Sequence, residues 1–347
     1  MTNTLPGVAV VVLNWNGRDD TLECLSSLKK IDYPNWTVIV ADNGSSDNSV
    51  SAIREQYPDI DLVENGTNLG FAEGNNRAIA RALEGGAEFV LILNNDTVVD
   101  PEIVSAFVRA AEQMPGGGVF GAKIYHYHQK DLLWYAGGYW DPETLRFEER
   151  GAGLRDEGQF EELTETEWVI GCAMFVRASV FRSIGLLEPK FFLNNEEIDF
   201  CSRAKRAGFS CVFVPDAKVW HKISVSFGGE HSPLKEYFIA RNRLLWAQRN
   251  ADTALRFRIY GQTLLGLVRR FLFPLGGRHQ QPIDLRRWWW RVRETFVDPI
   301  NRAHFLGVRD FVLGRFGDCP DAVRVLAKNW GRKSAADSST LMSPQEP

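Results

Sequence analysis

The chain lacks any apolar run long enough to cross a bilayer. The longest runs, such as Val8–Leu13, fall far short of the ~20 residues that a transmembrane helix needs. The first residues also lack the charged region and small-residue cleavage site of a secretory signal. We therefore expect a cytoplasmic protein without a spanning helix.

Cysteine is scarce and shows no pairing pattern. The five cysteines are odd in number, and no two of them form a Cys-x-x-Cys pair. This pattern excludes a disulfide framework and a zinc cluster of the usual spacing. The remaining composition, 44% apolar and 24% charged residues, excludes a disordered or collagen-like chain.

The net charge of −4 hides an uneven distribution along the chain. Residues 1–240 carry 21 Lys and Arg against 35 Asp and Glu, whereas residues 241–333 carry 19 against 7. We expect only the basic extension to meet an anionic membrane surface, and we expect no nucleic-acid partner because the acidic body would repel it. The Trp- and Arg-rich segment Arg286–Arg293 resembles an interfacial segment, and the alternative is a solvated helix that packs its Trp side chains on the body.

Short β-branched runs alternate with helical stretches in the first part of the chain. We expect strands over Val8–Leu13, Thr37–Ala41, Asp61–Val63 and Glu88–Leu93, and helices over Asp19–Lys29, Asn48–Tyr57 and Ala72–Leu83. This alternation is typical of βαβ units and a mainly parallel sheet. Later elements are a strand over Glu167–Val176 that Gly171-Cys172-Ala173 interrupts, a helix over Glu196–Ala207, a short strand over Cys211–Val214, basic helices beyond Ala240 and a disordered end over 334–347.

Four successive strand ends carry Asn, Asp and Gly. The segments are Asn14–Asn16, Asp42–Gly44, Asn65–Gly70 and Asn94–Asp96. Ligands of parallel sheets bind beyond the carboxyl ends of the strands, so these residues are candidates for binding a polar ligand. The alternative is ordinary turn chemistry, since the same residue types dominate turns.

Three groups of side chains could carry chemistry. Asp96 follows a buried strand, where a carboxylate can hold a divalent cation or simply cap a helix. Glu196, Glu197 and Asp199 open a helix, where the macrodipole favours acids, but the apolar residues before them predict burial, which is costly for acids without a role. His221 is either a metal ligand or a plain core or surface residue.

Read together, these segments resemble the family 2 glycosyltransferases of GT-A fold, in their rhamnosyltransferase-like branch. The resemblance covers residues 8 to about 245 and rests on five motifs and on three segments that resemble the nucleotide-binding segments of the family, Val10–Asn16, Val40–Asp47 and Asn68–Asn76. These motifs are Asn94-Asn95-Asp96 as the metal motif, Gly171-Cys172-Ala173-Met174 as the acceptor-side turn, Glu196-Glu197-Ile198-Asp199 with Arg203 as the base motif, Trp220-His221, and Tyr237–Asn242. The chain departs from the family in keeping only the last carboxylate of the metal motif, and in having Glu at the base position where Asp is more frequent.

The resemblance implies a role for each motif. It implies that Glu197 is the catalytic base, with Glu196 and Asp199 beside it, and that Asp96 and His221 bind Mg²⁺ or Mn²⁺. The implied nucleotide-sugar residues are Asn14, Asn16, Asp42, Asn43, Gly70, Asn75, Asn94 and Asn95. The implied acceptor residues are Cys172, Ala173, Arg203, Tyr237 and Arg241. The donor half would cover about 1–120 and the acceptor half about 120–240.

The expected fold is therefore an α/β GT-A domain with a mainly parallel mixed sheet, followed by a mostly helical basic extension over 241–333. The expected activity is inverting transfer of a sugar, rhamnose by resemblance, from a dTDP- or UDP-sugar to a glycan or lipid-linked glycan, in the cytoplasm or at the inner face of the membrane. A non-catalytic nucleotide-sugar binding protein is the first alternative. A dehydrogenase is the second, because Gly116–Gly121 matches Gly-x-Gly-x-x-Gly, but this match precedes a β-prone run instead of opening a helix. A processive synthase is disfavoured by the lack of spanning helices.

Overall fold

The computed structural model describes residues 5–223, 232–272, 286, 293 and 296–340. The chain divides into two compact units, Met1–Ile223 and Ser224–Pro347. The sequence placed this boundary at Ala240, which lies inside a helix, Pro233–Asn250, of the second unit. In the Trp-rich segment that was expected at an interface, residues 287–292 lie outside the described part.

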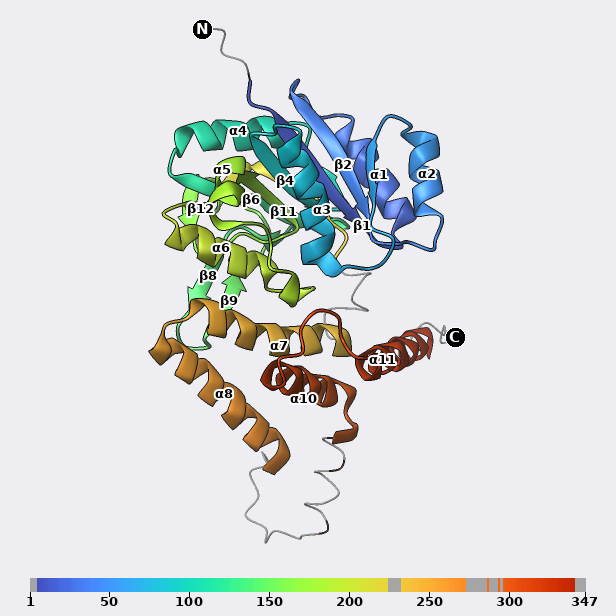
Figure 1. Ribbon diagram of the computed structural model, residues 1–347, viewed down its shortest axis with the longest axis vertical. Helices are drawn as coiled ribbons and strands as arrows, with labels where there is room; N and C mark the ends of the chain where they lie inside the picture. Colours follow the sequence, from blue (N-terminus) through green and yellow to red (C-terminus); the bar gives the residue numbers. More distant parts are fainter. Residues whose placement is uncertain (1–4, 224–231, 273–285, 287–292, 294–295, 341–347) are drawn as a thin grey trace, which may run out of the picture. The chain divides into compact units, whose positions relative to one another are not determined.

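The described part of the first unit contains a ten-stranded mixed sheet and a separate hairpin (Figure 1). The sheet strands are β1 (Val8–Asn14), β2 (Trp36–Asp42), β3 (Asp61–Glu64), β4 (Phe89–Asn94), β5 (Thr97–Val99), β6 (Gly117–His126), β7 (Gln129–Tyr135), β10 (Thr164–Thr166), β11 (Ala173–Arg177) and β12 (Ser210–His221). The hairpin consists of β8 (Gly138–Asp141) and β9 (Arg146–Glu149).

The main strands of the sheet follow the order β10-β12-β6-β11-β4-β1-β2-β3. This order determines which strands carry the candidate site. Strands β1 to β4 are parallel, and the chain moves outward from β1 to β3 before β4 returns to the other side of β1. In sheets of this kind, ligands usually bind beyond the carboxyl ends of the strands at such a reversal, which here are β1 and β4. Strand β11 then runs antiparallel between β4 and β6, so the sheet is mixed but mainly parallel, as the sequence predicted.

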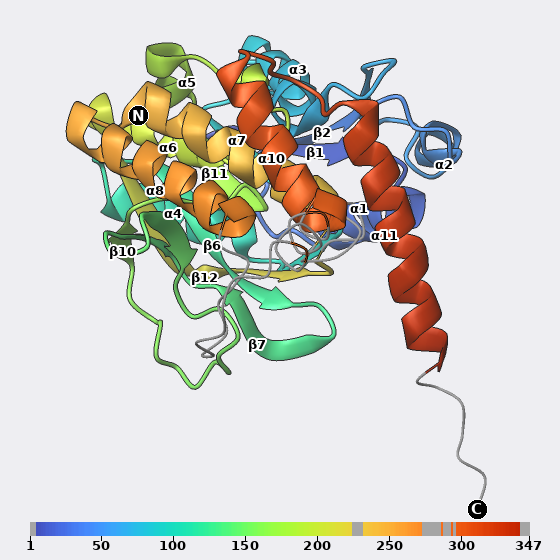
Figure 2. The same cartoon turned by 90° about the horizontal axis from the view of Figure 1, so that it is seen from below.

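Helices cover both faces of this sheet. They are α1 (Arg18–Leu28), α2 (Ser49–Gln56), α3 (Gly70–Glu84), α4 (Ile103–Gln113), α5 (Ala178–Ile184) and α6 (Glu196–Arg206), with a short 3₁₀ turn at Pro189–Phe191. Helices α3, α5 and α6 lie on one face, and α1 and α4 lie on the other (Figures 1 and 2). The central strands are buried on both faces, which explains why β1 is an almost uninterrupted run of Val.

Aromatic stacking joins the helices to the middle of the sheet. The Phe175 ring on β11 stacks between Phe89 and Phe107, with centroid separations of 4.7 and 4.9 Å. Such pairs add to the free energy gained by burying the rings. This stack anchors the strand that directly follows the predicted acceptor-side turn.

Two expected strands differ from the observed ones. The expected strand over Glu167–Val176 is wrong in its first half, because β11 begins only at Ala173. The strand expected to end at Pro215 instead continues to His221, since a register shift between Val214 and Lys218 accommodates a residue that cannot donate a ladder hydrogen bond. The segment Gly116–Gly121 runs into β6, so it does not have the strand-to-helix context of a dinucleotide fingerprint.

The second unit is helical over its described residues. It contains α7 (Pro233–Asn250), α8 (Thr253–Leu272), α10 (Pro299–Val312) and α11 (Asp321–Thr340), so helix continues past Lys333, where a disordered end was expected. Helices α7 and α10 pack closely at Gly307, where a Cβ would lie 2.4 Å from the Tyr237 carbonyl oxygen. Among the described residues of either unit, no helix has the length and apolar character needed to span a bilayer.

Glycine is required where α3 begins. Gly70 has φ +77°, and a Cβ there would lie 2.5 Å from the Phe192 carbonyl oxygen, which accepts a hydrogen bond from the Phe71 N–H at 2.6 Å. This contact fixes the start of α3 against the segment that leads to α6. Beyond the other end of α3 lies Gly86, which has φ +82° but no atom within 4 Å of the position that a Cβ would take.

These two glycines give a matched test of the contact. Both Ala substitutions place a side chain at positive φ, which costs about 1–2 kcal/mol. Gly70→Ala should cost about 1–3 kcal/mol more than Gly86→Ala, because only its methyl group meets backbone atoms. The free energy of unfolding in urea measures both variants, and equal losses would contradict the role assigned to the Phe192 contact.

Candidate active site

The carboxyl ends of β1 and β2 are joined by a buried polar pair. Parallel pairing sets Asn14 opposite Asp42. The Asn14 side-chain amide donates to Asp42 Oδ2 at 2.7 Å, and Asp42 Oδ1 accepts from the Ser45 N–H at 2.9 Å. Both carboxylate oxygens of Asp42 are thereby oriented, while each retains a second lone pair for a ligand.

The same asparagine links β1 to the end of β4. Asn14 Oδ1 accepts from the Thr21 hydroxyl at 2.8 Å and from the Asn95 amide at 3.2 Å. The Asn95 amide also donates to the Thr21 hydroxyl at 2.9 Å. Thr21 was missed in the sequence, where a single Thr inside a helix carries no distinctive signal.

The other residues that were predicted to bind the nucleotide sugar mostly form hydrogen bonds that stabilise loops. Asn16 has φ +52° and accepts from the Ser46 N–H at 2.7 Å, and Asn43 donates to the Gly70 carbonyl oxygen at 2.9 Å. Asn75 donates to the Phe71 carbonyl oxygen, while its own amide oxygen is buried without a partner among the described residues. The strand-end asparagines therefore do serve turn chemistry, and they gather at one edge of the sheet.

A carboxylate and an imidazole meet at the end of β4. Antiparallel pairing of β5 with β12 sets Thr97 opposite His221, so Asp96 Oδ1 lies 3.0 Å from His221 Nε2. The Trp134 ring lies against the imidazole, with a centroid separation of 4.6 Å. Burial lowers the pKa of His221, but the neighbouring Cys172 and Asp96 outweigh burial and raise that pKa to about 10.

Asp96 and His221 fit one divalent cation as two of its ligands. Their oxygen and nitrogen atoms face each other, and carboxylate oxygen with neutral imidazole nitrogen suits Mn²⁺ or Mg²⁺, so a bound cation would displace the His221 proton. Across the described residues no group of three or more His, Cys, Asp or Glu could hold a metal. Diphosphate oxygens and water would therefore have to complete the coordination. The Asn94 amide, 3.4 Å from His221 Nε2, lies at the edge of this pair.

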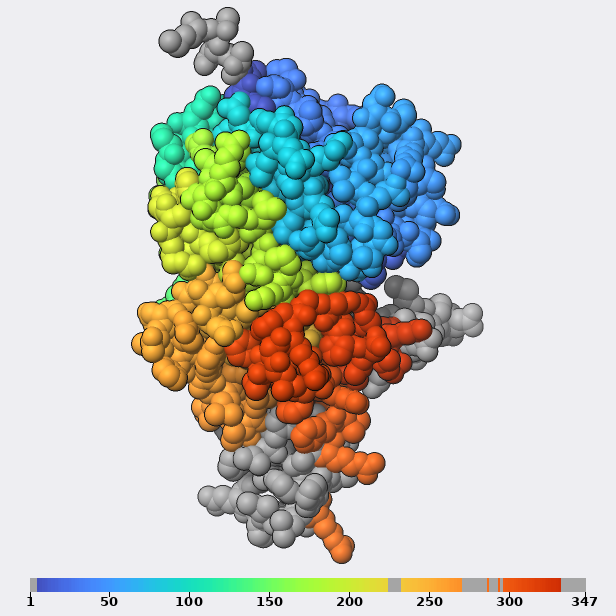
Figure 3. Space-filling view, in the orientation of Figure 1, coloured from blue at the N-terminus to red at the C-terminus, as the bar shows by residue number. Residues whose placement is uncertain are grey.

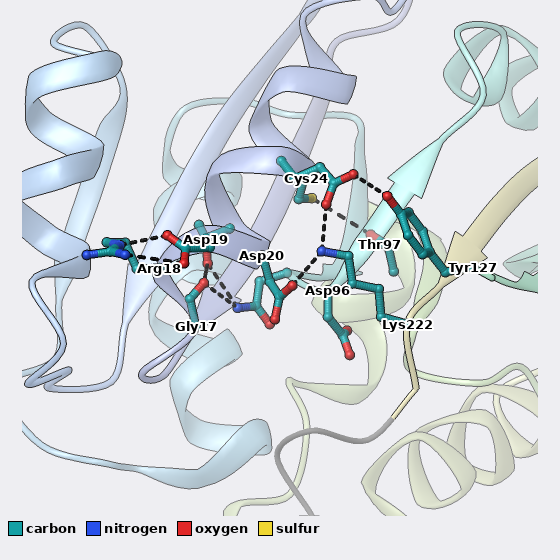
Figure 4. Close-up of polar contacts among 12 residues, drawn as sticks. Gly17, Arg18, Asp19, Asp20, Cys24, Asp96, Thr97, Tyr127 and Lys222 are labelled. Carbon is teal, nitrogen blue, oxygen red and sulfur yellow. Dashed lines mark hydrogen bonds and ion pairs between the residues drawn. The ribbon is translucent and has the colours of Figure 1, made fainter. Parts of the chain in front are cut away.

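A lysine connects the Asp96–His221 pair to helix α1. The Lys222 N–H donates to the Asp96 carbonyl oxygen at 3.0 Å. Its ammonium contacts Asp20 at 2.5 Å and Glu23 at 2.6 Å, and the Tyr127 hydroxyl donates to the same Glu23 (Figure 4). Burial opposes the charge, but these hydrogen bonds raise the pKa of Lys222. No sequence pattern marks this cluster, because its members lie far apart in the chain.

A buried carboxyl group, that of Glu196, and a half-buried one, that of Glu197, open α6. Phe192, Asn194 and Asn195 precede them with φ values of +63°, +69° and +72°, a strained approach that turns the chain inward. Burial raises the pKa of Glu197 to about 7, and burial together with the charge of Glu197 raises the pKa of Glu196 well above its ordinary value. One carboxyl oxygen of each is buried without a hydrogen-bond partner in the described part of the chain.

The turn before β11 connects the two carboxyl groups to the Asp96–His221 pair. A Cβ placed on Gly171 would lie 3.7 Å from Glu197 Cβ, so Glu197 packs directly on this turn. The next residue, Cys172, interacts with the His221 ring and accepts from the Asn94 N–H at 2.9 Å through its carbonyl oxygen. Ala173 then begins β11 opposite Leu93. The predicted base and the predicted cation ligands thus lie on either side of one turn.

One residue that was expected to bind the acceptor has internal partners. Arg203 donates to Asp199 at 2.8 Å and to the carbonyl oxygens of Ile184 and Leu186, each at 2.8 Å. Asp199 is fully buried in this pair. Removing either partner would leave a buried charge, which makes the pair a support for α6. The geometry therefore favours a supporting role for Arg203 over the predicted contact with the acceptor.

Tyr237 and Arg241 belong to the second unit. The Tyr237 hydroxyl donates to Asp310 at 2.9 Å, and Arg241 donates to the Gly317 carbonyl oxygen at 2.6 Å. Both side chains are buried and help to hold α7 to the segments that follow it. Their predicted contact with an acceptor remains a prediction.

The sequence is similar to those of known glycosyltransferases. The model of glycosyl transferase family 2 matches residues 9–185. N-acetylglucosaminyl-diphospho-decaprenol L-rhamnosyltransferase of Mycobacterium tuberculosis is 29% identical over 315 residues, which cover 80% of this chain and all of the relative. The dTDP-rhamnosyl transferase RfbF of Shigella flexneri is 24% identical, over 70% of this chain and 80% of that protein.

Solved structures show the same fold. Mannosyltransferase PcManGT from Pyrobaculum calidifontis, solved in complex with GDP-Man and Mn²⁺, aligns over 90% of this chain and 89% of its own with a TM-score of 0.55 and 16% identity. GalNAc-T7, solved with UDP, GalNAc and Mn²⁺, covers 75% of this chain and 55% of its own with a TM-score of 0.53 and 16% identity. The resemblance read from the motifs is confirmed, and the chain belongs to glycosyl transferase family 2, in its rhamnosyltransferase-like branch.

Proposed function

We propose that the protein transfers rhamnose from a thymidine diphosphate donor to a hydroxyl of a glycan or lipid-linked glycan, with inversion at the anomeric carbon. The position of Glu197 carries the proposal: it packs on the turn whose next residue interacts with His221. The printed activities of the Mycobacterium tuberculosis and Shigella flexneri relatives support the choice of sugar. A UDP-sugar is the alternative donor within the same chemistry.

Glu197 acts as the general base in this proposal. Attack on the anomeric carbon requires a group that accepts the proton of the incoming hydroxyl, and such a group works best with a pKa near the working pH. Burial gives Glu197 a pKa of about 7, and one of its oxygens is buried without a partner among the described residues. Attack from the side of this base, opposite the leaving diphosphate, inverts the configuration.

Asp96 and His221 would hold the cation at the leaving diphosphate. A bound Mg²⁺ or Mn²⁺ supplies positive charge where negative charge grows as the sugar leaves. The protein orients the two ligands through Lys222, which binds the Asp96 carbonyl oxygen, and through Trp134, whose ring lies against His221. Asp42 and Asn14 are proposed to bind the nucleotide at the neighbouring strand ends.

The acceptor is proposed to bind beside the turn at Cys172 and Ala173. The turn presents backbone next to Glu197, where an acceptor hydroxyl must lie for its proton to be taken. The name of the Mycobacterium tuberculosis relative specifies an acceptor attached to decaprenol. By analogy we place the reaction at a membrane surface, with the protein bound peripherally.

Replacing the base with its amide should abolish transfer without abolishing donor binding. Glu197→Gln keeps the shape but cannot take the proton, so kcat should fall by about 10²–10⁴-fold. Transfer from dTDP-rhamnose to an acceptor glycan measures kcat, and calorimetric titration with the donor measures binding. Glu157→Gln, at an exposed acid, is the control. Unimpaired transfer by Glu197→Gln would remove Glu197 from this role.

The rate should depend on pH near neutrality. A base must be ionised, so kcat should fall about tenfold per pH unit below the Glu197 pKa of about 7, well above the ordinary glutamate value of 4.5. Glu196→Gln should leave this acid limb in place, because the raised pKa of Glu196 keeps it neutral already. A kcat profile that stays flat down to the ordinary glutamate range would contradict a buried base.

Removing a cation ligand should weaken the response to metal. Asp96→Asn and His221→Gln should each raise the Mn²⁺ concentration needed for half-maximal activity by at least the ~10–100-fold typical of losing a supporting contact. Activity after chelation and stepwise return of Mn²⁺ gives this value, and His128→Gln, at an exposed histidine, is the control. If both ligand variants respond to metal like the parent protein, these residues do not hold the cation.

A further inference from the structure

Helix α8 has one face that no other described helix covers. Its inner side packs within the second unit: Ile259 is fully buried, and the Tyr260 ring lies 5.8 Å from the Phe311 ring of α10. In contrast, Phe257, Leu264 and Leu265 are 71%, 63% and 48% exposed. The helix lies at the edge of the unit in both ribbon views, and part of its surface is open in the space-filling view (Figures 1, 2 and 3).

The exposed apolar residues form one stripe along the helix. Positions 257, 261, 264 and 265 follow the i, i+4, i+7, i+8 spacing of a single helical face. Gly261 is also exposed, so no polar side chain interrupts the stripe between Phe257 and Leu264. Two further residues, Arg258 and Arg269, are exposed beside it. Large apolar side chains bordered by arginine are the pattern of a helix that lies in a membrane interface.

The charge of α8 decides between possible partners. Its 20 residues include four arginines and no Asp or Glu. A second copy of the same helix would bring arginines against arginines, which is unfavourable. Nucleic acid would satisfy the arginines but would leave the Phe and Leu side chains without an apolar environment. An anionic bilayer provides both an acyl boundary for the stripe and negative headgroups for the arginines.

We propose that α8 is a membrane-docking helix, which lies in the plane of an anionic bilayer surface with Phe257, Leu264 and Leu265 inserted and Arg258 and Arg269 at the headgroups. The proposal concerns a described helix, not the Trp-rich segment around residue 290. It is also independent of the transfer chemistry, because α8 belongs to the second unit and the proposed base and cation ligands belong to the first. Docking would keep the enzyme where lipid-linked acceptors are found.

Vesicle co-sedimentation of the full chain tests the proposal. Phosphatidylcholine vesicles should bind the protein weakly, whereas vesicles of phosphatidylcholine and phosphatidylglycerol in equal parts should bind it strongly and lose it as salt is added. Glu197→Gln should bind these vesicles like the parent protein, so the docking result does not depend on the proposed activity. Failure of the parent protein to bind anionic vesicles would overturn the proposal.

Two double variants separate the apolar from the ionic contribution. Arg258→Gln with Arg269→Gln should weaken binding to the anionic vesicles by about fivefold for each arginine removed. Leu264→Gln with Leu265→Gln should weaken binding at least about tenfold, because two side chains no longer gain from leaving water. All four side chains are exposed, and thermal unfolding checks that the variants remain folded.

A matched control tests whether the loss of vesicle binding is specific to α8. Val325→Gln changes an apolar residue of α11 that is 57% exposed, and it should leave vesicle binding unchanged. Binding by both double variants equal to that of the parent protein would show that another segment docks, and would overturn the proposal. So would a self-association of the parent chain, seen by sedimentation without vesicles, that the Leu264→Gln/Leu265→Gln variant loses.

Discussion

The arrangement of the candidate site depends on the backbone turn at Gly171 and Cys172. Gly171 has no side chain, so the Phe71 ring and the Cβ of Glu197 can pack against the turn. Cys172 accepts a hydrogen bond from the Asn94 N–H and interacts with the His221 ring. One short segment therefore contacts both the proposed base and a proposed cation ligand, and β11 fixes it to the centre of the sheet.

Burying acids next to this turn is unfavourable in itself, and the surrounding structure offsets that cost. Burial raises the pKa values of Glu196 and Glu197, so these groups retain their protons more readily. A neutral carboxyl group costs less free energy to bury than a charged one. The Asp199–Arg203 pair holds α6 by binding two carbonyl oxygens that precede it. Glu197, the proposed base, thereby has a pKa of about 7, which suits proton transfer near neutral pH and which an exposed glutamate would not have.

Much of the fold could be predicted from local sequence patterns. Continuous apolar runs such as Val8–Leu13 marked the buried parallel strands, because a strand covered by helices on both faces has no polar side. The order of strand-end motifs was sufficient to identify the family, which the family model confirms. Predictions failed where a local signal was overridden, as at Pro215, where a bulge lets β12 continue, and at Ala240, which lies within a helix that packs on later helices.

The sequence by itself determined the α/β class, the family and the residue types that gather at the strand ends, because periodicity and motif order are local properties. Only the tertiary structure decided that Asn14 orients Asp42 and Thr21, and that Lys222 holds the strand carrying His221 against α1. It also decided which face of α8 remains exposed. Hydrogen-bond partners and burial depend on which distant segments of the chain come into contact. No pattern within a single segment determines those contacts.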